Sequence, residues 1–274
     1  MATLPYPCTA LPLNSADFQS ALNALQTDAA AVWALLEVES GRAGYLPDRR
    51  PQILFERAVF HTRTGGRFDA THPGISATTW GGYSGGAAEY TRLAEAYALS
   101  PDDALQSVSW GIAQVMGFNF SPSGFTSAED YVKNSCASEG AQLMAFQNFL
   151  LHTGVAQALA AHDWSSVALH YNGSGQVSVY AGRLQNNYAA LSQPGQLPDL
   201  NVRAAQLYLT FLANASNNPA LNPNGIDGLL GNGTLKALQA FQTANGVAVT
   251  NTIDAGTVAA LAAALPAAVD LSLH

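Results

Sequence analysis

Residues 27–41 read TDAAAVWALLEVESG and predict one helix that carries two glutamates near its C-terminal end. Thr27 can cap the start of this helix. Gly41 can end it, because glycine readily adopts the left-handed backbone conformation that follows a last helical turn. The apolar positions recur with helical spacing, which predicts that one face of the helix is buried. The two glutamates therefore meet different surroundings.

Glu39 is the glutamate on the buried side of this helix. It continues the apolar stripe of Val32, Leu35 and Leu36, whereas Glu37 lies about 200° around the helix axis from it. Burial and the negative end of the helix dipole both favour the neutral carboxyl, so both raise its pKa. A carboxyl that stays protonated near neutral pH suits a general acid for glycosidic cleavage. The alternative is a partly buried glutamate paired with a nearby arginine.

The composition narrows the class of protein. The chain has 274 residues, of which 48% are hydrophobic and 11% charged, and its formal net charge is −8. Such a chain can build a core, which excludes wholesale disorder, and its acidity does not suit a nucleic-acid binder. No uninterrupted apolar run exceeds the length of residues 29–36, which is far shorter than the ~20 residues that cross a bilayer, so we expect no membrane span.

The N-terminus and the cysteines carry little functional signal. Residues 1–18 lack Lys and Arg and include three prolines, which argues against a Sec signal peptide. Cys8 and Cys136 lack the spacing of a zinc site and are either two unpaired structural thiols or one disulfide. No two of the six histidines lie four residues apart. We therefore expect neither a metal nor a cofactor.

A linker-like segment, SQPGQLPD at residues 192–199, divides the chain. We expect a mostly helical domain over residues 1–192, with a small β element, and a compact unit over residues 199–270. The first domain should contain a short strand within residues 51–60. Its helices are predicted over residues 15–25, 27–41, 87–99, 109–116, 128–136, 139–152, 164–171 and 177–190, with another starting at Ser100.

Two later segments hold polar residues in apolar surroundings. Gly111 interrupts the predicted helix of residues 109–116, and a close approach of the backbone to a ligand would explain a glycine there. Gln114 in the same segment either faces a cleft or is satisfied in the core. Tyr171-Asn172-Gly173 ends a later helix, where the tyrosine can bind a sugar or simply pack.

Together these segments resemble the lysozyme superfamily. Their order and spacing are similar to the E-S, G-L-x-Q-[IV]-M and Y-N motifs of soluble lytic transglycosylases and goose-type lysozymes. The closer resemblance is to the phage N-acetylmuramidase endolysins, over about residues 20 to 190. It rests on Glu37–Gly41, Ile53–Arg57, Arg67–Asp69, His72-Pro73, Gly81–Tyr83 and Gln106–Gly111.

This resemblance implies a mainly α protein with a lysozyme-like α+β catalytic domain. It implies hydrolysis of the β-1,4 bond between N-acetylmuramic acid and N-acetylglucosamine, with Glu39 as the catalytic acid. Glu56 matches a family glutamate and is the candidate second carboxylate, acting as base or as stabiliser of the oxocarbenium-like transition state. Its alternative is a buried glutamate paired with Arg57 or another arginine. Asp48 and Asp69 are weaker candidates.

The resemblance also implies a set of substrate-binding residues. Tyr171 would orient the acid, and the aromatic rings at Trp80 and Tyr83 would stack on sugar faces or merely pack. The full set is Gln114, Tyr171, Asn172, Trp80 and Tyr83. Six of the eleven basic residues fall between Arg42 and Arg67. They either make structural pairs and bonds to loop backbone or hold carboxylates of a substrate peptide or lactyl group.

The unit after the linker resembles peptidoglycan-binding domain 1, whose signature is D-G-x-x-G-x-x-T-x-x-A-[LV]-x-x-F-Q. The matching residues are Asp227-Gly228, Gly231, Thr234, Ala237-Leu238 and Phe241-Gln242. Helices from Val202 to Leu212 and from Asp254 to Leu265 should complete a small three-helix core. No aromatic cluster marks a ligand groove, so the resemblance indicates the fold more strongly than the binding.

Three functions remain to be weighed. The first is a peptidoglycan hydrolase, the second a lytic transglycosylase that closes a 1,6-anhydro ring, and the third a non-catalytic cell-wall-binding or virion protein. Glu39 and its companion motifs favour an enzyme. We expect a monomer that is made in the host cytoplasm without a signal peptide and acts on the periplasmic wall. Release through a holin is the expected route, with a secreted antibacterial effector as the alternative.

Overall fold

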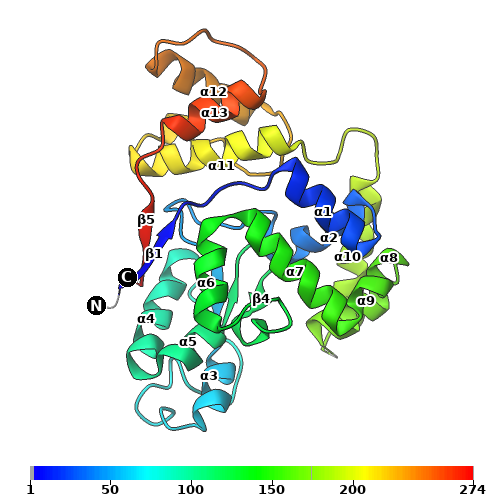
Figure 1. Ribbon diagram of the computed structural model, residues 1–274, viewed down its shortest axis with the longest axis vertical. Coiled ribbons are helices and arrows are strands. Elements are labelled where there is room, and N and C mark those ends of the chain that lie inside the picture. Colours follow the sequence, from blue (N-terminus) through cyan, green and yellow to red (C-terminus); the bar gives the residue numbers. More distant parts are fainter. Residues whose placement is uncertain (1–2, 174, 274) are drawn as a thin grey trace.

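The computed structural model describes residues 3–173 and 175–273, without the side chains of residues 3–5, 172 and 272. It confirms a mainly helical protein with small β elements (Figure 1). The helical segments before the linker are α1 (Ser15–Leu25), α2 (Ala29–Ser40), α3 (Arg57–Thr64), η1 (Gly86–Ala88), α4 (Glu89–Leu99), α5 (Pro101–Gln106), η2 (Gly117–Asn119), α6 (Ala128–Ala137), α7 (Glu139–Thr153), α8 (Val155–Ala160), α9 (Trp164–Asn172) and α10 (Val177–Leu191).

Helix α2 is the central helix of the larger core. All of its residues from Ala30 to Leu36 are buried. Asp28 caps it, accepting a hydrogen bond from the backbone N–H of Ala31 at 2.9 Å, so the prediction of Thr27 as the cap was wrong by one residue. An aspartate outcompetes the neighbouring threonine because its carboxylate also complements the positive end of the helix dipole. Gly41 ends the helix in the left-handed conformation, as predicted.

A three-stranded antiparallel sheet lies next to this helical core. Its strand order is β2 (Ile53–Phe55), β3 (Val108–Trp110) and β4 (Val115–Met116). Strand β2 is shorter than the predicted segment because α3 begins directly after Glu56. The sheet is the small β element that the sequence predicts for this part of the chain.

The predicted helix over residues 109–116 was wrong, because this segment forms the β3–β4 hairpin. Gly111 and Gln114 both have positive φ, at 73° and 50°, which turns the chain back and breaks a helix. A Cβ at Gly111 would lie 2.4 Å from Cδ of Gln142. The glycine therefore permits close packing against a buried side chain, and no ligand is needed to explain it.

After the linker come α11 (Leu200–Ala215), η3 (Pro219–Leu221), α12 (Asn232–Ala244) and α13 (Ala255–Ala263). They build a second, smaller core, which is the three-helix unit predicted from the sequence. Gln206 of α11 stabilises the turn at Asp227-Gly228 before α12. Its side chain bonds the Asp227 side chain, the Gly228 N–H and the Thr234 side chain at 2.8, 2.8 and 2.9 Å. Gly228 has φ 74°, and a Cβ there would lie 2.6 Å from the Pro198 side chain.

The last strand returns to the beginning of the chain. Strand β5 (Val269–Ser272) pairs antiparallel with β1 (Thr3–Cys8), so the two ends of the described chain lie side by side (Figure 1). Leu271 and Leu273 are buried in the larger core, away from the three-helix unit that precedes them. Neither strand was predicted from the sequence.

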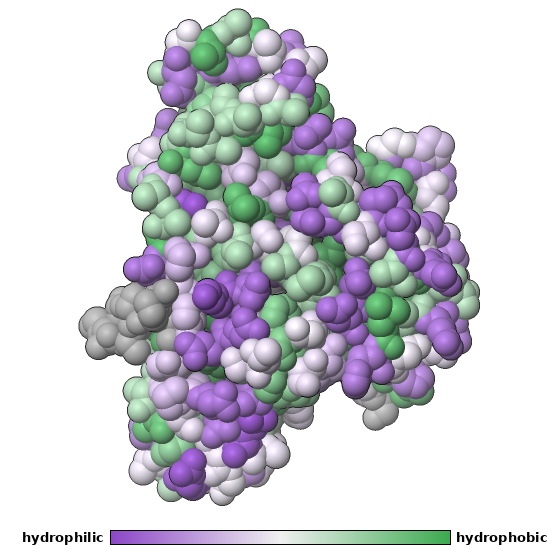
Figure 2. Space-filling view, viewed as in Figure 1, coloured by the Kyte–Doolittle hydropathy of each residue, from purple (hydrophilic) through white to green (hydrophobic). Residues whose placement is uncertain are grey.

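The two cysteines are neighbours in this region. Cys8 in β1 and Cys136 in α6 are both buried free thiols, and a hydrogen bond joins their side chains. Of the two alternatives, the structure shows unpaired structural thiols. Within the described residues, no helix has the length and apolar character needed to cross a membrane. On the face shown in Figure 2, hydrophilic residues are scattered among apolar ones.

Candidate active site

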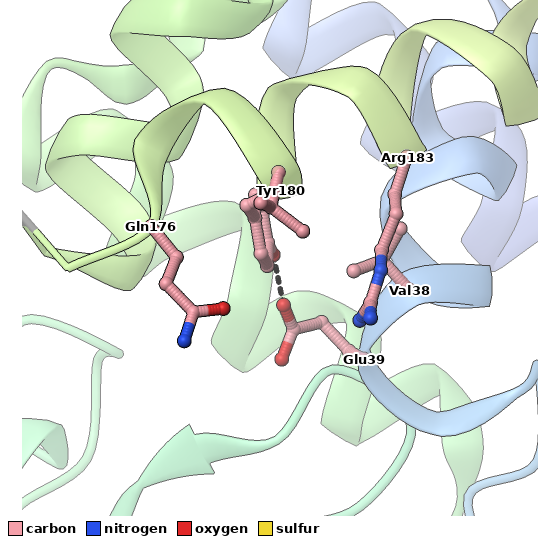
Figure 3. Close-up of a pocket in the computed structure, with 6 residues that line it drawn as sticks. Val38, Glu39, Gln176, Tyr180 and Arg183 are labelled. Atoms are coloured by element: carbon pink, nitrogen blue, oxygen red, sulfur yellow. Dashed lines mark hydrogen bonds between the residues drawn. The ribbon is translucent and has the colours of Figure 1, made fainter.

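Glu39 is the penultimate residue of α2, and its half-buried carboxyl lies between two cavities. The Tyr180 hydroxyl donates a hydrogen bond to Oε1 of this carboxyl (Figure 3). Burial raises the pKa of Glu39 to about 7, although the hydrogen bond from Tyr180 acts in the opposite direction. At neutral pH a large fraction of this group therefore keeps its proton.

Glu37 occupies a different environment. It forms an ion pair with Arg42 and does not line either cavity beside Glu39. Glu39 itself forms no ion pair with any residue of 3–173 or 175–273. The alternative considered for Glu39, a glutamate paired with an arginine, is therefore found at Glu37 instead. The side chains of Glu37 and Glu39 point in different directions, as their positions around the helix predict.

The larger of the two cavities has a volume of about 370 Å³, and we call it the cleft. It brings together residues from α2, β2, α3, the β3–β4 hairpin, η2, α9 and the loop between α3 and η1 that carries Trp80. Its lining residues are Glu39, Leu54, Glu56, Val59, Trp80, Ser109, Gln114, Met116, Phe118 and Tyr171. Five of the residues predicted from the sequence therefore share one cleft. Trp80 is 64% exposed.

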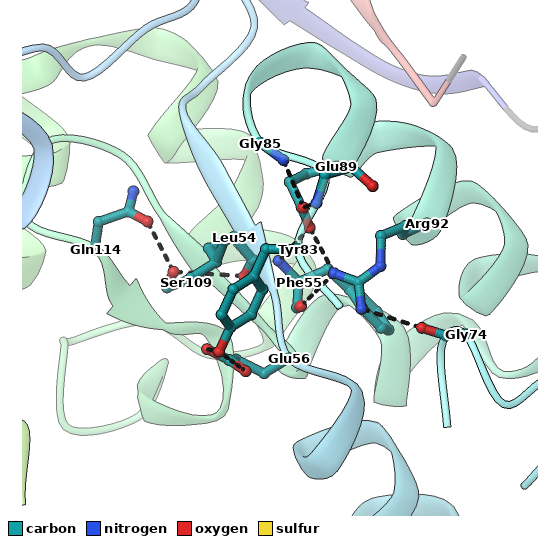
Figure 4. Close-up of polar contacts among 11 residues, drawn as sticks. Leu54, Phe55, Glu56, Gly74, Tyr83, Gly85, Glu89, Arg92, Ser109 and Gln114 are labelled. Carbon is teal, nitrogen blue, oxygen red and sulfur yellow. Dashed lines mark hydrogen bonds and ion pairs between the residues drawn. The ribbon is translucent and has the colours of Figure 1, made fainter. Parts of the chain in front are cut away.

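Glu56 lies at the end of β2, where α3 begins, and is buried. The Tyr83 hydroxyl is 3.0 Å from each of its carboxylate oxygens, which places Tyr83 beside the cleft (Figure 4). The pKa of Glu56 is raised above its ordinary value, and burial is the main cause. The Tyr83 hydrogen bond and the charge of Arg92 lower this pKa, whereas the charge of Glu89 raises it. Glu89 and Arg92 pair with each other at 2.8 Å directly behind β2.

Arg57 does not pair with Glu56. Its guanidinium donates to the carbonyls of Thr79 and Trp80 at 2.8 and 3.1 Å. Arg57 thereby fixes the loop that carries Trp80, and Glu56 keeps its carboxylate oxygens for Tyr83 and the cleft.

Gln114 lines the cleft and also stabilises the hairpin. Its Oε1 accepts a hydrogen bond from the Ser109 hydroxyl at 2.9 Å, and its Nε2 donates to the Gly111 carbonyl at 2.8 Å. The sequence left two alternatives for Gln114, that it faces a cleft or that it is hydrogen-bonded in the core. Both apply, because the same amide bonds the hairpin turn and lines the cavity. Asn172 ends α9, but its side chain lies outside the described part of the structure.

Tyr171 lines the cleft but does not orient the acid. Its hydroxyl donates to the Ala113 carbonyl at 2.5 Å, so the expectation that it holds Glu39 was wrong. Tyr180 on α10 takes that position, and the sequence analysis missed it. The available signal was the helical spacing of Val179, Tyr180 and Arg183, which places these three on one face of α10, with Gln176 directly before the helix as its N-cap.

Asp48 and Asp69, the weaker candidates for the second carboxylate, lie away from the cleft. Asp48 pairs with Arg50 at 2.6 Å. Asp69 bonds His61 at 2.7 Å and the Ser76 hydroxyl at 2.5 Å. Neither residue lines a cavity beside Glu39.

The arginine cluster between Arg42 and Arg67 is structural, which is one of the two alternatives given above. Each member pairs with a carboxylate or donates to loop carbonyls. The contacts are Arg42 with Glu37, Arg49 with the carbonyls of Thr9, Pro266 and Ala267, Arg50 with Asp48, Arg57 with Thr79, Arg63 with Asp103, and Arg67 with Thr64. In the described ranges no group of three or more His, Cys, Asp or Glu side chains could hold a metal ion.

The family model described as N-acetylmuramidase matches residues 28–192, more than half of the chain. The chain belongs to the N-acetylmuramidase family. The matched span contains every residue that lines the cleft. A second family model, described as "Putative peptidoglycan binding domain", matches residues 198–261. The resemblances drawn from the sequence motifs are thereby confirmed for both parts of this N-acetylmuramidase.

A solved structure supports the same assignment. The crystal structure of Burkholderia AP3 phage endolysin is 39% identical to this N-acetylmuramidase, with a TM-score of 0.59. The similarity covers 65% of this chain and 69% of the other. No curated protein sequence matches the chain.

Proposed function

We propose that this N-acetylmuramidase hydrolyses the β-1,4 bond between N-acetylmuramic acid and N-acetylglucosamine in peptidoglycan. The observation that carries the proposal is the Glu39 carboxyl, which faces a cleft and has its pKa raised to about 7 by burial. Such a group is protonated often enough near neutral pH to give its proton to a glycosidic oxygen.

Tyr180 determines which oxygen of Glu39 carries the proton in this mechanism. Its hydroxyl donates to Oε1, so Oε1 serves as an acceptor. The proton of the neutral acid then resides on Oε2, which is free to reach the leaving oxygen of the sugar. Tyr180 is therefore a positioning residue, and Glu39 is the catalytic acid.

Glu56 is the second carboxylate of the proposed mechanism. It shares the cleft with Glu39, and Tyr83 holds both of its oxygens in place. It either activates a water molecule or stabilises the positive charge that develops on the sugar ring. These two roles predict opposite anomeric configurations in the product, inversion for the first and retention for a covalent form of the second.

The other predicted residues form the sugar-binding surface of the proposal. Trp80 and Tyr83 offer aromatic rings for stacking on pyranose faces, and Gln114 and Tyr171 complete the cleft. Asn172 belongs to the proposed surface on the family resemblance alone, because its side chain lies outside the described part of the structure. We assign catalysis to residues 1–192 and attachment to the wall to residues 199–270. A wall-binding unit raises the local concentration of glycan strands near the cleft.

The proposed setting follows the similar phage endolysin. This chain would act as a monomeric lysis enzyme on the periplasmic cell wall of the host, after release through a holin. It would need neither a metal nor a cofactor, since an acid and a second carboxylate suffice for hydrolysis of a glycosidic bond.

Digestion of purified peptidoglycan tests the proposal. Mass spectrometry of the released fragments should show reducing N-acetylmuramic acid ends, and borohydride should reduce them. Products with 1,6-anhydro ends would instead assign the lytic transglycosylase reaction and overturn the proposal. The Glu39→Gln variant should lose about a thousandfold in rate while still sedimenting with the wall. The matched Glu37→Gln variant should keep its activity, because Glu37 lies outside the cleft.

A further inference from the structure

A second cavity lies on the other side of the acid. It has a volume of about 230 Å³ and shares Glu39 with the cleft. The face of α10 described above supplies most of its wall (Figure 3). The lining residues are Val38, Glu39, Gln176, Val179, Tyr180 and Arg183. We call it the Arg183 cavity. The proposed reaction at Glu39 does not by itself require this space.

Arg183 differs from every other arginine of the chain. Eight of the nine arginines pair with carboxylates or donate to carbonyls. Within residues 3–173 and 175–273, the Arg183 guanidinium has no hydrogen bond or ion pair. The side chain of Gln176 across the cavity is likewise without a partner there. A five-donor cation and an amide are thus left free beside the acid in a protein of net charge −8.

The free guanidinium does not serve Glu39 itself. No ion pair joins the two groups, and the pKa of Glu39 is explained by burial and by the Tyr180 hydrogen bond. The neighbouring carboxylate of Glu37 is not available to it either, because Glu37 pairs with Arg42. The arrangement therefore suits a ligand that brings its own negative charge.

The chemistry of the proposed substrate identifies that charge. The sugar rings of peptidoglycan are neutral, and every carboxylate of a glycan strand belongs to the lactyl ether of the muramoyl residue or to the peptide on it. A planar guanidinium binds a carboxylate through two parallel hydrogen bonds. Because the acid must meet the muramoyl glycosidic bond, the substituent of that same ring lies within reach of a cavity next to Glu39.

We propose that the Arg183 cavity is a subsite for the lactyl-peptide substituent of the muramoyl residue, with Arg183 binding its carboxylate and Gln176 its amide groups. The inference rests on the proposed function and names the part of the substrate that this side of the acid recognises. The carboxylate comes from one of two sources. It is either the lactyl group itself, in strands without peptides, or an acidic residue of the peptide stem.

Three soluble glycan substrates test the inference. The first carries intact peptide stems, the second has been stripped by an amidase to free its lactyl carboxylates, and the third has all its carboxylates converted to amides. The kcat/KM of wild type is compared with that of Arg183→Ala on each. Lys133→Ala is the matched control, because it removes one positive charge from an exposed position on α6 that lines neither cavity.

Arg183→Ala should lower kcat/KM about tenfold on a carboxylate-bearing substrate, mainly through KM. The loss should vanish on the fully amidated strands, and Arg183→Lys should restore part of it. A loss on the stem-bearing strands assigns a peptide carboxylate, and a loss confined to the stripped strands assigns the lactyl carboxylate. An equal loss on all three substrates, or no loss on any, overturns the inference.

A binding measurement separates this inference from the proposed function. The Kd of stem-bearing and stripped fragments is measured by calorimetry for Glu39→Gln with and without Arg183→Ala, and no turnover is needed. If the wild-type protein released no reducing ends, the proposed function would be contradicted. The binding comparison would still show whether Arg183 binds the carboxylate of the substrate. Thermal unfolding of each variant shows whether the substitution leaves the fold intact.

Discussion

Arg203 of α11 and Glu139 of α7 form an ion pair in which neither side chain is exposed to solvent. The same carboxylate accepts hydrogen bonds from the backbone N–H groups of Leu13 and Gly44, both at 2.9 Å. The guanidinium carbon lies 5.5 Å from the ring centre of Trp33 on α2. The three-helix unit is therefore attached through a buried charge to the helix that carries Glu39.

Removing Arg203 should strongly destabilise the protein. Arg203→Ala leaves the Glu139 charge buried without its cation, and we expect the free energy of unfolding to fall by about 3–5 kcal/mol in urea titrations. Arg67→Ala is the control, since this arginine is exposed and donates only to a nearby carbonyl. A double replacement, Arg203→Met with Glu139→Gln, should recover part of the loss. A single-variant loss no larger than that of Arg67→Ala would contradict the role of this pair.

Truncation after the linker should weaken the catalytic part as well. A chain ending at residue 192 lacks the cation for Glu139, the β5 partner of β1, and two leucines of the larger core. We expect a lower Tm for this fragment than for the whole chain, and a smaller decrease when only residues 268–274 are removed. Equal Tm values for the fragment and the whole chain would show that residues 1–192 are stable by themselves.

Tyr180→Phe should move the high-pH side of the activity profile upward. The hydrogen bond from Tyr180 lowers the pKa of Glu39, so its removal raises that pKa and keeps the acid protonated to higher pH. The maximum rate should fall, because the carboxyl loses its orientation. The pH dependence of kcat/KM reports the shift. Tyr188→Phe is the control on the same helix, since the Tyr188 hydroxyl bonds Asp28 and Ser192 and not Glu39. An unchanged or lowered alkaline limb would count against Tyr180 as the positioning residue.

Glu39→Gln should make the protein more stable at high pH. The pKa of Glu39 is about 7 in the folded protein against 4.5 as its ordinary value, so the folded state binds this proton more tightly than the unfolded state. Stability from this group is complete below pH 4.5 and is lost as the pH rises through 7. At pH 8 the variant should exceed wild type by about 3 kcal/mol, with little difference near pH 4. Urea unfolding at several pH values measures this. A constant difference across the range would mean that Glu39 is not the shifted group.

The hairpin of residues 108–116 shows where sequence reasoning failed. Its apolar residues and a serine at the start favour a helix when the segment is read alone. The pairing of β3 with β2 and the packing of Gly111 on Gln142 select the extended form instead. Both partners lie far away in the chain, so local spacing carries no information about them.

The cleft itself was largely predictable, because the motifs around Glu39, Glu56, Gln114 and Tyr171 keep the order of a known family. The tyrosine whose hydroxyl bonds Glu39 was not predictable in this way. Tyr171 and Tyr180 lie on helices joined by a short loop, and the packing of α10 against α2 determines which of them reaches Glu39.

By itself, the sequence determined the central helix, the glutamate on its buried side, the three-helix unit and the family, because helical periodicity and motif order are properties of neighbouring residues. Only the tertiary structure decided the donor to Glu39, the partner of Glu139, the pairing of the two chain ends and which arginine has no partner among the described residues. Each of these depends on which groups from distant segments meet in a space closed to water, where a charge or a polar group must find its partner.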